Sequence, residues 1–249
     1  MGKKNDDLPI VVKDLHKAFG DQSVLNGIDL RVAPGETLAV LGRSGTGKSV
    51  LLKLIIRLQA PDSGTIRVAG QELANLNEEQ LNQVRKKVGF LFQQAALYDS
   101  LTVEENVAFP LSRHTRMSGA EQKERVRELL ADVGMDRELG KMPAEISGGM
   151  QKRVGLARAL ALEPEILLFD EPTSGLDPIT AGEVGELIVA LKQSRKMSAI
   201  VVTHDVHQAQ VFSDRLVLLH EGKILAEGTF VELQESQNEV VAQFMGHGS

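Results

Sequence analysis

The segment Gly42-Arg43-Ser44-Gly45-Thr46-Gly47-Lys48-Ser49 lies between an apolar run, Thr37–Leu41, and a helical-looking run, Val50–Leu58. It matches the phosphate-loop pattern, in which glycines let main-chain N–H groups curl around phosphate oxygens. The helix that follows adds about half a positive charge facing the same oxygens. Strand, loop and helix in this order favour a phosphate-binding loop over a Gly-rich turn that only reverses the chain.

Two residues of the loop supply a charge and a metal ligand. Lys48 is expected to neutralise the β- and γ-phosphates of a nucleotide, and Ser49 to ligate Mg²⁺. The other members of the loop are expected to hold the phosphates through their main chain; they are Gly42, Arg43, Ser44, Gly45, Thr46 and Gly47.

A second motif, Ile166-Leu167-Leu168-Phe169-Asp170-Glu171, places two carboxylates at the end of an apolar strand. Burying charge there is costly unless a metal or another partner offsets it. Asp170 is placed to hold Mg²⁺, and Glu171 to deprotonate the water that attacks the γ-phosphate. Because acidic residues also end many strands without a function, this assignment depends on the presence of Lys48.

Short β-rich segments predict a sheet, and the helical segments that alternate with the later ones are typical of an α/β fold with parallel strands. The predicted strands are Ile28–Val32, Thr37–Leu41, Val88–Phe92, Ile166–Asp170, Ala199–Thr203 and Leu216–Leu219, and the helices are Ile179–Lys192 and His207–Asp214. Turn signals at Pro34-Gly35 and Pro61-Asp62-Ser63-Gly64 indicate an N-terminal antiparallel β part beside the parallel sheet.

Residues 93–160 carry no strand signal and read as helical. One helix there has a capping box of Ser118 and Glu121 and ends at Gly134. Its apolar face consists of Val126, Leu129, Leu130 and Val133. We expect a single domain over residues 1–249, with residues 1–92 and 161–249 as the nucleotide-binding core and residues 93–160 as an inserted helical lobe.

The composition is that of an ordinary folded domain, with 42% hydrophobic and 25% charged residues. The sequence contains no cysteine, which excludes disulfides and a cysteine nucleophile. Its formal charge of -6 argues against nucleic acid as a partner. The polar start, residues 1–8, does not resemble a secretory signal, and the longest apolar run, Leu187–Leu191, is too short to span a membrane. A cytoplasmic location is expected, and any membrane role requires a partner.

The segment Ile146-Ser147-Gly148-Gly149-Met150 begins another predicted helix, which runs to about Leu162. Ser147 is a good N-cap, and the two glycines are compatible with a simple loop, so local chemistry alone does not make this a phosphate site. The order of motifs changes that interpretation, because over nearly its whole length the chain resembles the ATPases of ABC transporters. The shared motifs are the phosphate loop, Gln93, Ser147-Gly148-Gly149, Asp170-Glu171, Ser174-Gly175-Leu176-Asp177 and His204.

The resemblance implies a P-loop fold of the ABC type, with ATP and Mg²⁺ as cofactors, that hydrolyses ATP as a head-to-tail dimer. In such a dimer Ser147, Gly148 and Gly149 bind the γ-phosphate held by Lys48 of the other copy. Each site would therefore need both chains.

Two catalytic assignments come from the resemblance alone. Gln93 resembles the loop glutamine that contacts Mg²⁺ and the attacking water; Gln94 has the same chemistry, but Gln93 directly follows the predicted strand. His204 resembles the switch histidine that contacts the γ-phosphate and aligns Glu171. The resemblance implies a catalytic group of Lys48, Gln93, Glu171 and His204.

Further contacts are implied at the edges of the site. Asp177 resembles the aspartate that reaches across the dimer. Phe19 either stacks on adenine, as an aromatic residue does at this place in the family, or packs in the core. In the C-terminal tail, Val240, Val241 and Phe244 either pack against the core or contact a neighbouring subunit.

A narrower resemblance concerns the cargo. The runs Ser147–Val154 and Asp170–Thr180, together with Leu91–Pro110, look like those of the ATPases of MCE-linked lipid-trafficking systems of the Mla and Mkl type. Met150 stands where most of the family has glutamine. The resemblance implies an ATPase that drives a permease moving phospholipid or a related hydrophobic molecule, with Gln93–Pro110 as the docking segment.

The partners implied are a second copy of the chain, an integral membrane permease dimer contacted by the helical lobe, an MCE-type lipid-binding protein and a small regulatory subunit. The implied location is the cytoplasmic face of the inner membrane. Two alternatives stay open: an importer ATPase for a polar solute, and a soluble ABC ATPase that acts on a protein scaffold. A P-loop kinase or GTPase lacks support because the sequence has no Asn-Lys-x-Asp motif.

Overall fold

The strand that precedes the phosphate loop is β3 (Thr37–Leu41), and every one of its residues is buried. In the computed structural model, which describes residues 8–246, this strand lies inside a six-stranded sheet of order β10-β9-β3-β8-β7-β6. An interior strand covered on both faces explains the unbroken apolar run. The other strands are β6 (Val88–Leu91), β7 (Ile166–Asp170), β8 (Ser198–Thr203), β9 (Arg215–His220) and β10 (Lys223–Gly228).

The register of this sheet positions the site. The strands from β9 to β6 pair in parallel, and only β10 pairs antiparallel, with β9. Leu41 pairs with Thr203, and Asp170 pairs with Val202. The carboxyl ends of β3, β8 and β7 therefore meet at one edge, which brings together the phosphate loop, the acidic pair and the histidine that follows β8.

A second sheet is antiparallel and has the order β2-β1-β4-β5. Its strands are β1 (Ile10–Phe19), β2 (Gln22–Val32), β4 (Ser63–Val68) and β5 (Gln71–Glu72). Apolar side chains of both sheets meet around α1 (Lys48–Ile55), as Val12, Val40 and Leu52 do. This sheet confirms the predicted antiparallel part.

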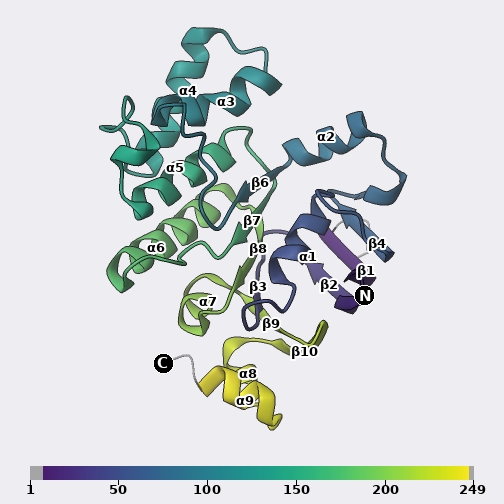
Figure 1. Ribbon diagram of the computed structural model, residues 1–249. Coiled ribbons are helices and arrows are strands. Elements are labelled where there is room, and N and C mark those ends of the chain that lie inside the picture. Colours follow the sequence, from purple (N-terminus) through teal and green to yellow (C-terminus); the bar gives the residue numbers. More distant parts are fainter. Residues whose placement is uncertain (1–7, 247–249) are drawn as a thin grey trace.

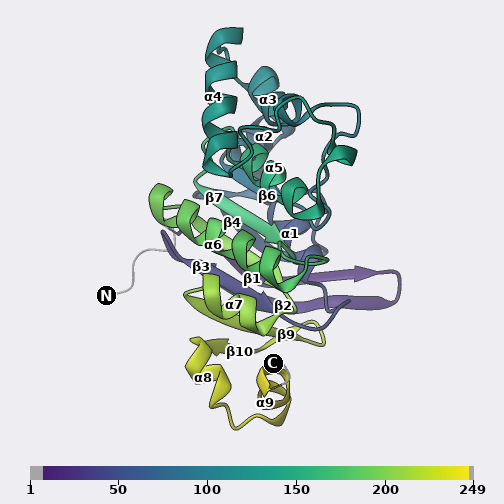
Figure 2. The same ribbon diagram turned by 90° about the vertical axis from the view of Figure 1, so that its left-hand side faces the viewer.

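The segment between β6 and β7 contains helices and no strand. Its long helices are α3 (Val103–His114), α4 (Gly119–Asp132) and α5 (Gly148–Leu160). They gather at one end of the molecule (Figures 1 and 2), and their core is continuous with that of the sheet, because Val107 and Leu130 share a cluster with Phe169 and Val201. The helical lobe is therefore packed onto the sheet and shares its core.

The remaining helices complete the layers. The same face of the sheet carries α6 (Pro178–Arg195) and α7 (Val206–Phe212), whereas α2 (Glu78–Lys86) leads into β6. A short 3₁₀ turn, Leu73–Asn75, follows β5, and another, Pro143–Glu145, precedes α5. Over residues 8–246 no helix combines the length and apolar character needed to cross a membrane.

The C-terminal helices α8 (Phe230–Gln234) and α9 (Glu239–Gly246) lie at the end opposite the lobe (Figure 1). Val241 is fully buried in a cluster with β3 and β9, and Phe244 packs against that cluster, while Val240 is 38% exposed. Packing therefore accounts for Val241 and Phe244, and only Val240 of the three offers an open apolar surface.

The predicted elements agree with the structure in type and differ at their ends. The Ser118–Glu121 capping box is present, and Gly134 has a φ of 68°. The segment Ile28–Val32 is the end of the longer β2, and α1 ends at Ile55 because Arg57 adopts a left-handed φ of 52°. The interpretation of residues 1–8 as a polar start lies outside the described residues except at Leu8.

Candidate nucleotide site

The phosphate loop connects β3 to α1 and depends on its glycines. Gly45 and Gly47 have φ values of 83° and 99°, which few other residues adopt. A Cβ on Gly47 would lie 2.8 Å from Cγ1 of Val24, and one on Gly42 would lie 2.7 Å from the carbonyl of Leu219. The loop therefore packs closely against its neighbours at Gly42 and Gly47, and a larger side chain at either position would displace it.

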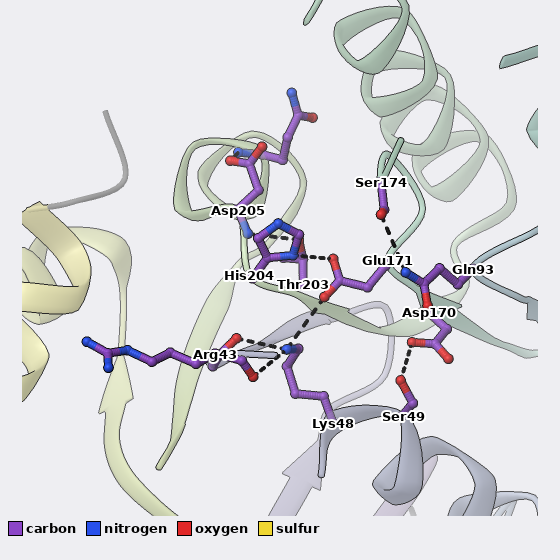
Figure 3. A network of polar contacts seen from close by, with 12 residues as sticks. Arg43, Lys48, Ser49, Gln93, Asp170, Glu171, Ser174, Thr203, His204 and Asp205 are labelled. Atoms are coloured by element: carbon purple, nitrogen blue, oxygen red, sulfur yellow. Dashed lines mark hydrogen bonds and ion pairs between the residues drawn. The ribbon is translucent and has the colours of Figure 1, made fainter. Parts of the chain in front are cut away.

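Lys48 points into this loop. Its Nζ donates to the carbonyls of Gly42 at 2.8 Å and Arg43 at 3.1 Å, and lies 3.5 Å from Oε1 of Glu171. Burial lowers the pKa of Lys48, while the neighbouring Glu171 acts in the opposite direction. The side chain of Arg43 points away from this group (Figure 3).

Ser49 and Asp170 face each other across the site. Ser49 Oγ donates to Oδ1 of Asp170 at 2.7 Å (Figure 3). Asp170 is buried at the end of β7, and this burial raises the pKa of its carboxyl, although the hydrogen bond from Ser49 lowers it in part. A hydroxyl and a carboxylate from two different elements thus converge on one point.

Glu171 occupies the centre of the site. One carboxylate oxygen faces Lys48, and the other lies 2.9 Å from Nδ1 of His204 (Figure 3). The main chain of Glu171 has a left-handed φ of 47°, and its N–H donates to the carbonyl of Val202 at 2.9 Å. The structure therefore brings together Lys48, His204 and Glu171, which are widely separated in the sequence.

Gln93 approaches the site from the loop after β6. Its side-chain nitrogen donates to Ser174 Oγ at 3.5 Å, and its main-chain carbonyl accepts a hydrogen bond from Lys152. Lys152 also donates to the carbonyl of Glu171 at 3.1 Å. Burial lowers the pKa of Lys152 to about 8.

The remaining predicted residues lie apart from the central group. Ser147 accepts a hydrogen bond from Met150 N–H as the N-cap of α5, and both Ser147 and Gly148 are exposed. Gly149 packs so closely on α6 that a Cβ there would lie 2.4 Å from Cγ2 of Thr180. Among the described contacts, none joins these three signature residues to the phosphate loop of the same chain.

Asp177 and Phe19 are both at the surface. Asp177 caps α6 by accepting hydrogen bonds from the N–H groups of Ile179 and Thr180, and a bond from the Thr180 hydroxyl is the main cause of its lowered pKa. Phe19 is 47% exposed, and Lys17 Nζ lies 5.3 Å from its ring centre. The interpretation of Phe19 as a core residue is therefore wrong. Its ring is accessible at the surface, where it can stack on a ligand.

Sequence reasoning assigned no role to Lys152, although a signal was available. On α5, Lys152 lies three residues after Gly149 and four before Leu156, and both of these are on the buried face. A charge on the buried face of a helix requires partners that compensate it. Those partners are main-chain carbonyls, which a sequence pattern does not reveal.

Comparison with known proteins shows the family to which the chain belongs. Residues 25–174 match the family model described as ABC transporter. The protein TRIGALACTOSYLDIACYLGLYCEROL 3, chloroplastic, of Arabidopsis thaliana is 41% identical over 98% of this chain and 75% of its own length. The intermembrane phospholipid transport system ATP-binding protein MlaF of Haemophilus influenzae is 39% identical over 95% of this chain and 89% of its own. The methionine import ATP-binding protein MetN of Brucella abortus is also 39% identical, over 95% of this chain and 64% of its own.

Among solved structures, the dimeric post-hydrolysis state of the ATP-binding cassette MJ0796 bound to ADP and Pi has a TM-score of 0.81. It is 34% identical, and the match covers 88% of this chain and 98% of that one. The chain therefore belongs to the ABC transporter family, and it is an ATP-binding and ATP-hydrolysing subunit of that family.

Proposed function

We propose that two copies of this chain close head to tail on two ATP molecules and thereby drive a membrane permease that moves phospholipid or a related hydrophobic molecule. The observation that carries the catalytic part is the position of the Glu171 carboxylate between Lys48 and His204 (Figure 3). Beside it lies the Ser49–Asp170 pair. The division of the chain into a nucleotide-binding core, residues 1–92 and 161–249, and a helical lobe, residues 93–160, is also part of this proposal.

Within one subunit each residue has a separate task. Lys48 turns from the Gly42 and Arg43 carbonyls to the β- and γ-phosphates, and the main-chain N–H groups of the loop hold the phosphate oxygens. Glu171 takes a proton from the water that attacks the γ-phosphate, and His204 holds that carboxylate in place. The His204 side chain is 54% exposed, so its ring is open to the γ-phosphate.

Mg²⁺ is the second cofactor that we propose, and the residues present fit it. Ser49 and Asp170 offer hydroxyl and carboxylate oxygens, which Mg²⁺ prefers, and a cation would offset the cost of burying Asp170. Within residues 8–246 no cluster of three His, Cys, Asp or Glu side chains could hold a metal alone. When bound, Mg²⁺ would neutralise charge on the β- and γ-phosphates.

Other contacts of the proposed site come from more distant segments. Gln93 would complete the Mg²⁺ ligands and orient the attacking water, and the exposed ring of Phe19 would stack on adenine. Ser147, at the exposed start of α5, would meet the γ-phosphate of the other subunit together with Gly148 and Gly149. Asp177, already at the surface, would reach across the same interface.

The permease is proposed to dock beside α3. A cleft of about 440 Å³ opens between the β6 end and α3, and it is lined by Lys86, Val88, Gly89, Phe90, Phe92, Ala96, Tyr98, Phe109, Pro110, His114, Arg158, Ala159 and Leu162. The rings of Tyr98 and Phe109 pack against each other within it, tilted by 45° and with ring centres 4.7 Å apart. Tyr98 is 46% exposed, so an apolar segment could pack on an aromatic surface there. Docking at this cleft would hold the chain on the cytoplasmic face of the membrane.

The lipid cargo is supported by two relatives whose names concern lipids, and by the MCE-type pattern around Met150. The methionine importer has the same identity as the phospholipid transport ATPase, which is why an importer ATPase for a polar solute is the alternative. An MCE-type protein and a small regulatory subunit belong to the lipid proposal.

The cargo is tested by isolating the chain from detergent-solubilised native membranes and identifying bound proteins and lipids by mass spectrometry. The proposal predicts a multispanning permease, an MCE-type protein and an excess of phospholipid over a control isolation with an unrelated tagged ATPase. A permease recovered with a polar-solute receptor would replace lipid transport by the importer alternative. Recovery only with a protein scaffold in the soluble fraction would contradict a transport role.

A further inference from the structure

Lys152 is a buried charge that no assigned function uses. It lies on α5 and is 5% exposed. Its Nζ donates to the main-chain carbonyls of Glu171, at 3.1 Å, and of Gln93. An ammonium removed from water in this way is stable only when such partners compensate it. The helix that begins with the signature residues is thus tied to two other segments of the site by one side chain.

The bond to Glu171 acts on a strained piece of main chain. A left-handed φ of 47° is unfavourable for a residue with a Cβ and persists only when the surroundings enforce it. The Glu171 N–H is held by Val202 of β8, and its carbonyl accepts from Ser174 N–H at 3.2 Å and from Lys152. Because the main chain sets the direction of the side chain, these bonds also aim the carboxylate at Lys48.

The bond to Gln93 acts on a second strained segment. Ala95 and Ala96 have left-handed φ values of 57° and 48°. Arg158, which is also on α5, donates to their carbonyls at 2.6 and 2.8 Å. The loop that carries Gln93 is therefore held to α5 by two side chains, Lys152 and Arg158. Of these two, Lys152 also binds the main chain of Glu171.

We propose that Lys152 is a positioning residue for ATP hydrolysis, which locks the main chains of Glu171 and Gln93 to α5 and so holds the Glu171 carboxylate at its place. The inference rests on the role proposed for Glu171. It also gives α5 a direct connection to the hydrolytic carboxylate of its own subunit, although its first residue, Ser147, is proposed to face the ATP of the other.

The test compares Lys152→Met, which keeps the length of the side chain but removes its donors, with Lys152→Arg. The Met variant is expected to lower kcat about ten- to a hundredfold, because a small misplacement of a catalytic group has effects of this size. KM for ATP should change less than about twofold, since the phosphate loop is untouched. Arg can donate to both carbonyls, as Arg158 does to Ala95 and Ala96, and should restore most of kcat.

Lys192→Met is the matched control, because Lys192 forms an ion pair with Asp214 away from the site. It should leave kcat unchanged. An unchanged kcat in a folded Lys152→Met protein would overturn the inference, and so would an equal loss in the Arg variant. If the Met variant does not fold, Lys152→Arg is compared with Lys152→Gln, whose side chain is shorter and neutral. A clearly higher kcat for the Arg variant would support the inference, and an equal kcat for the two variants would overturn it. Glu171→Gln in the same assay separates the two proposals, since its full activity would remove the role of Glu171 itself.

Discussion

Glu171→Gln is expected to lower kcat for ATP hydrolysis by at least about a hundredfold, the usual effect of removing a general base. Gln has nearly the same shape, so it can keep a hydrogen bond to His204, but it cannot accept the proton of the attacking water. KM for ATP should change little, because Lys48 and the loop that bind the phosphates remain. The measurement is steady-state release of phosphate by the purified protein with Mg²⁺ and ATP.

Glu186→Gln is the control for this substitution. Glu186 is an exposed residue of α6, so the same chemical change there should leave kcat within about twofold of the unmodified protein. If Glu171→Gln hydrolysed ATP at the rate of this control, Glu171 would not be the base, and the proposed chemistry would be wrong.

Lys48→Met is expected to remove most of the affinity for ATP. Hydrogen bonds to charged groups contribute about 1.5–3 kcal/mol each, so loss of contacts to two phosphates should raise Kd at least about a hundredfold. At an ATP concentration of 100 Kd, the unmodified protein gains about 2.7 kcal/mol of stability against unfolding, whereas the variant should gain about 0.4 kcal/mol. Thermal unfolding with and without ATP measures the difference.

The control for Lys48→Met is Lys123→Met, because Lys123 is exposed on α4. That protein should be stabilised by ATP as much as the unmodified one. The proposed magnesium site makes a separate prediction, which is that chelation of Mg²⁺ should stop hydrolysis by the protein in which Lys48 is intact. Full stabilisation of the Lys48→Met protein by ATP would contradict the assignment of Lys48 to the phosphates.

The parts of the site that could be predicted are those encoded by contiguous residues. The phosphate loop and the Asp170–Glu171 pair each lie at the end of a buried apolar strand, and parallel strands bring such ends to one edge. The left-handed φ of Glu171 and the Lys152 bonds could not be predicted, because they depend on how α5 approaches the sheet. The sequence also identifies Ser147 as an N-cap, but the role proposed for it at the γ-phosphate depends on the resemblance to a family.

The same distinction applies to the fold. β1 is not evident from the sequence because its apolar start, Ile10–Val12, is short and is followed by the polar residues Lys13 and Asp14. At that point the pairing with β2 shifts in register, and Asp14 has a left-handed φ of 45°. Helix ends differed where a single residue terminates or caps the helix: Arg57 follows α1 with a positive φ, and Asp205 caps α7. Interior strands such as β3 were predictable, since burial on both faces leaves a continuous apolar run.

Sedimentation of the Glu171→Gln protein with and without Mg-ATP tests the proposed head-to-tail dimer most directly, because it reports the number of copies that associate. The protein alone should be monomeric without nucleotide and dimeric with it. Adding Ser147→Asp should abolish the dimer, because aspartate keeps the N-cap of α5 but repels the γ-phosphate of the other subunit. Ser118→Asp, at the N-cap of α4, should not. A Glu171→Gln protein that stays monomeric with ATP and permease, or that dimerises equally well with Ser147→Asp, would contradict a site shared between two chains.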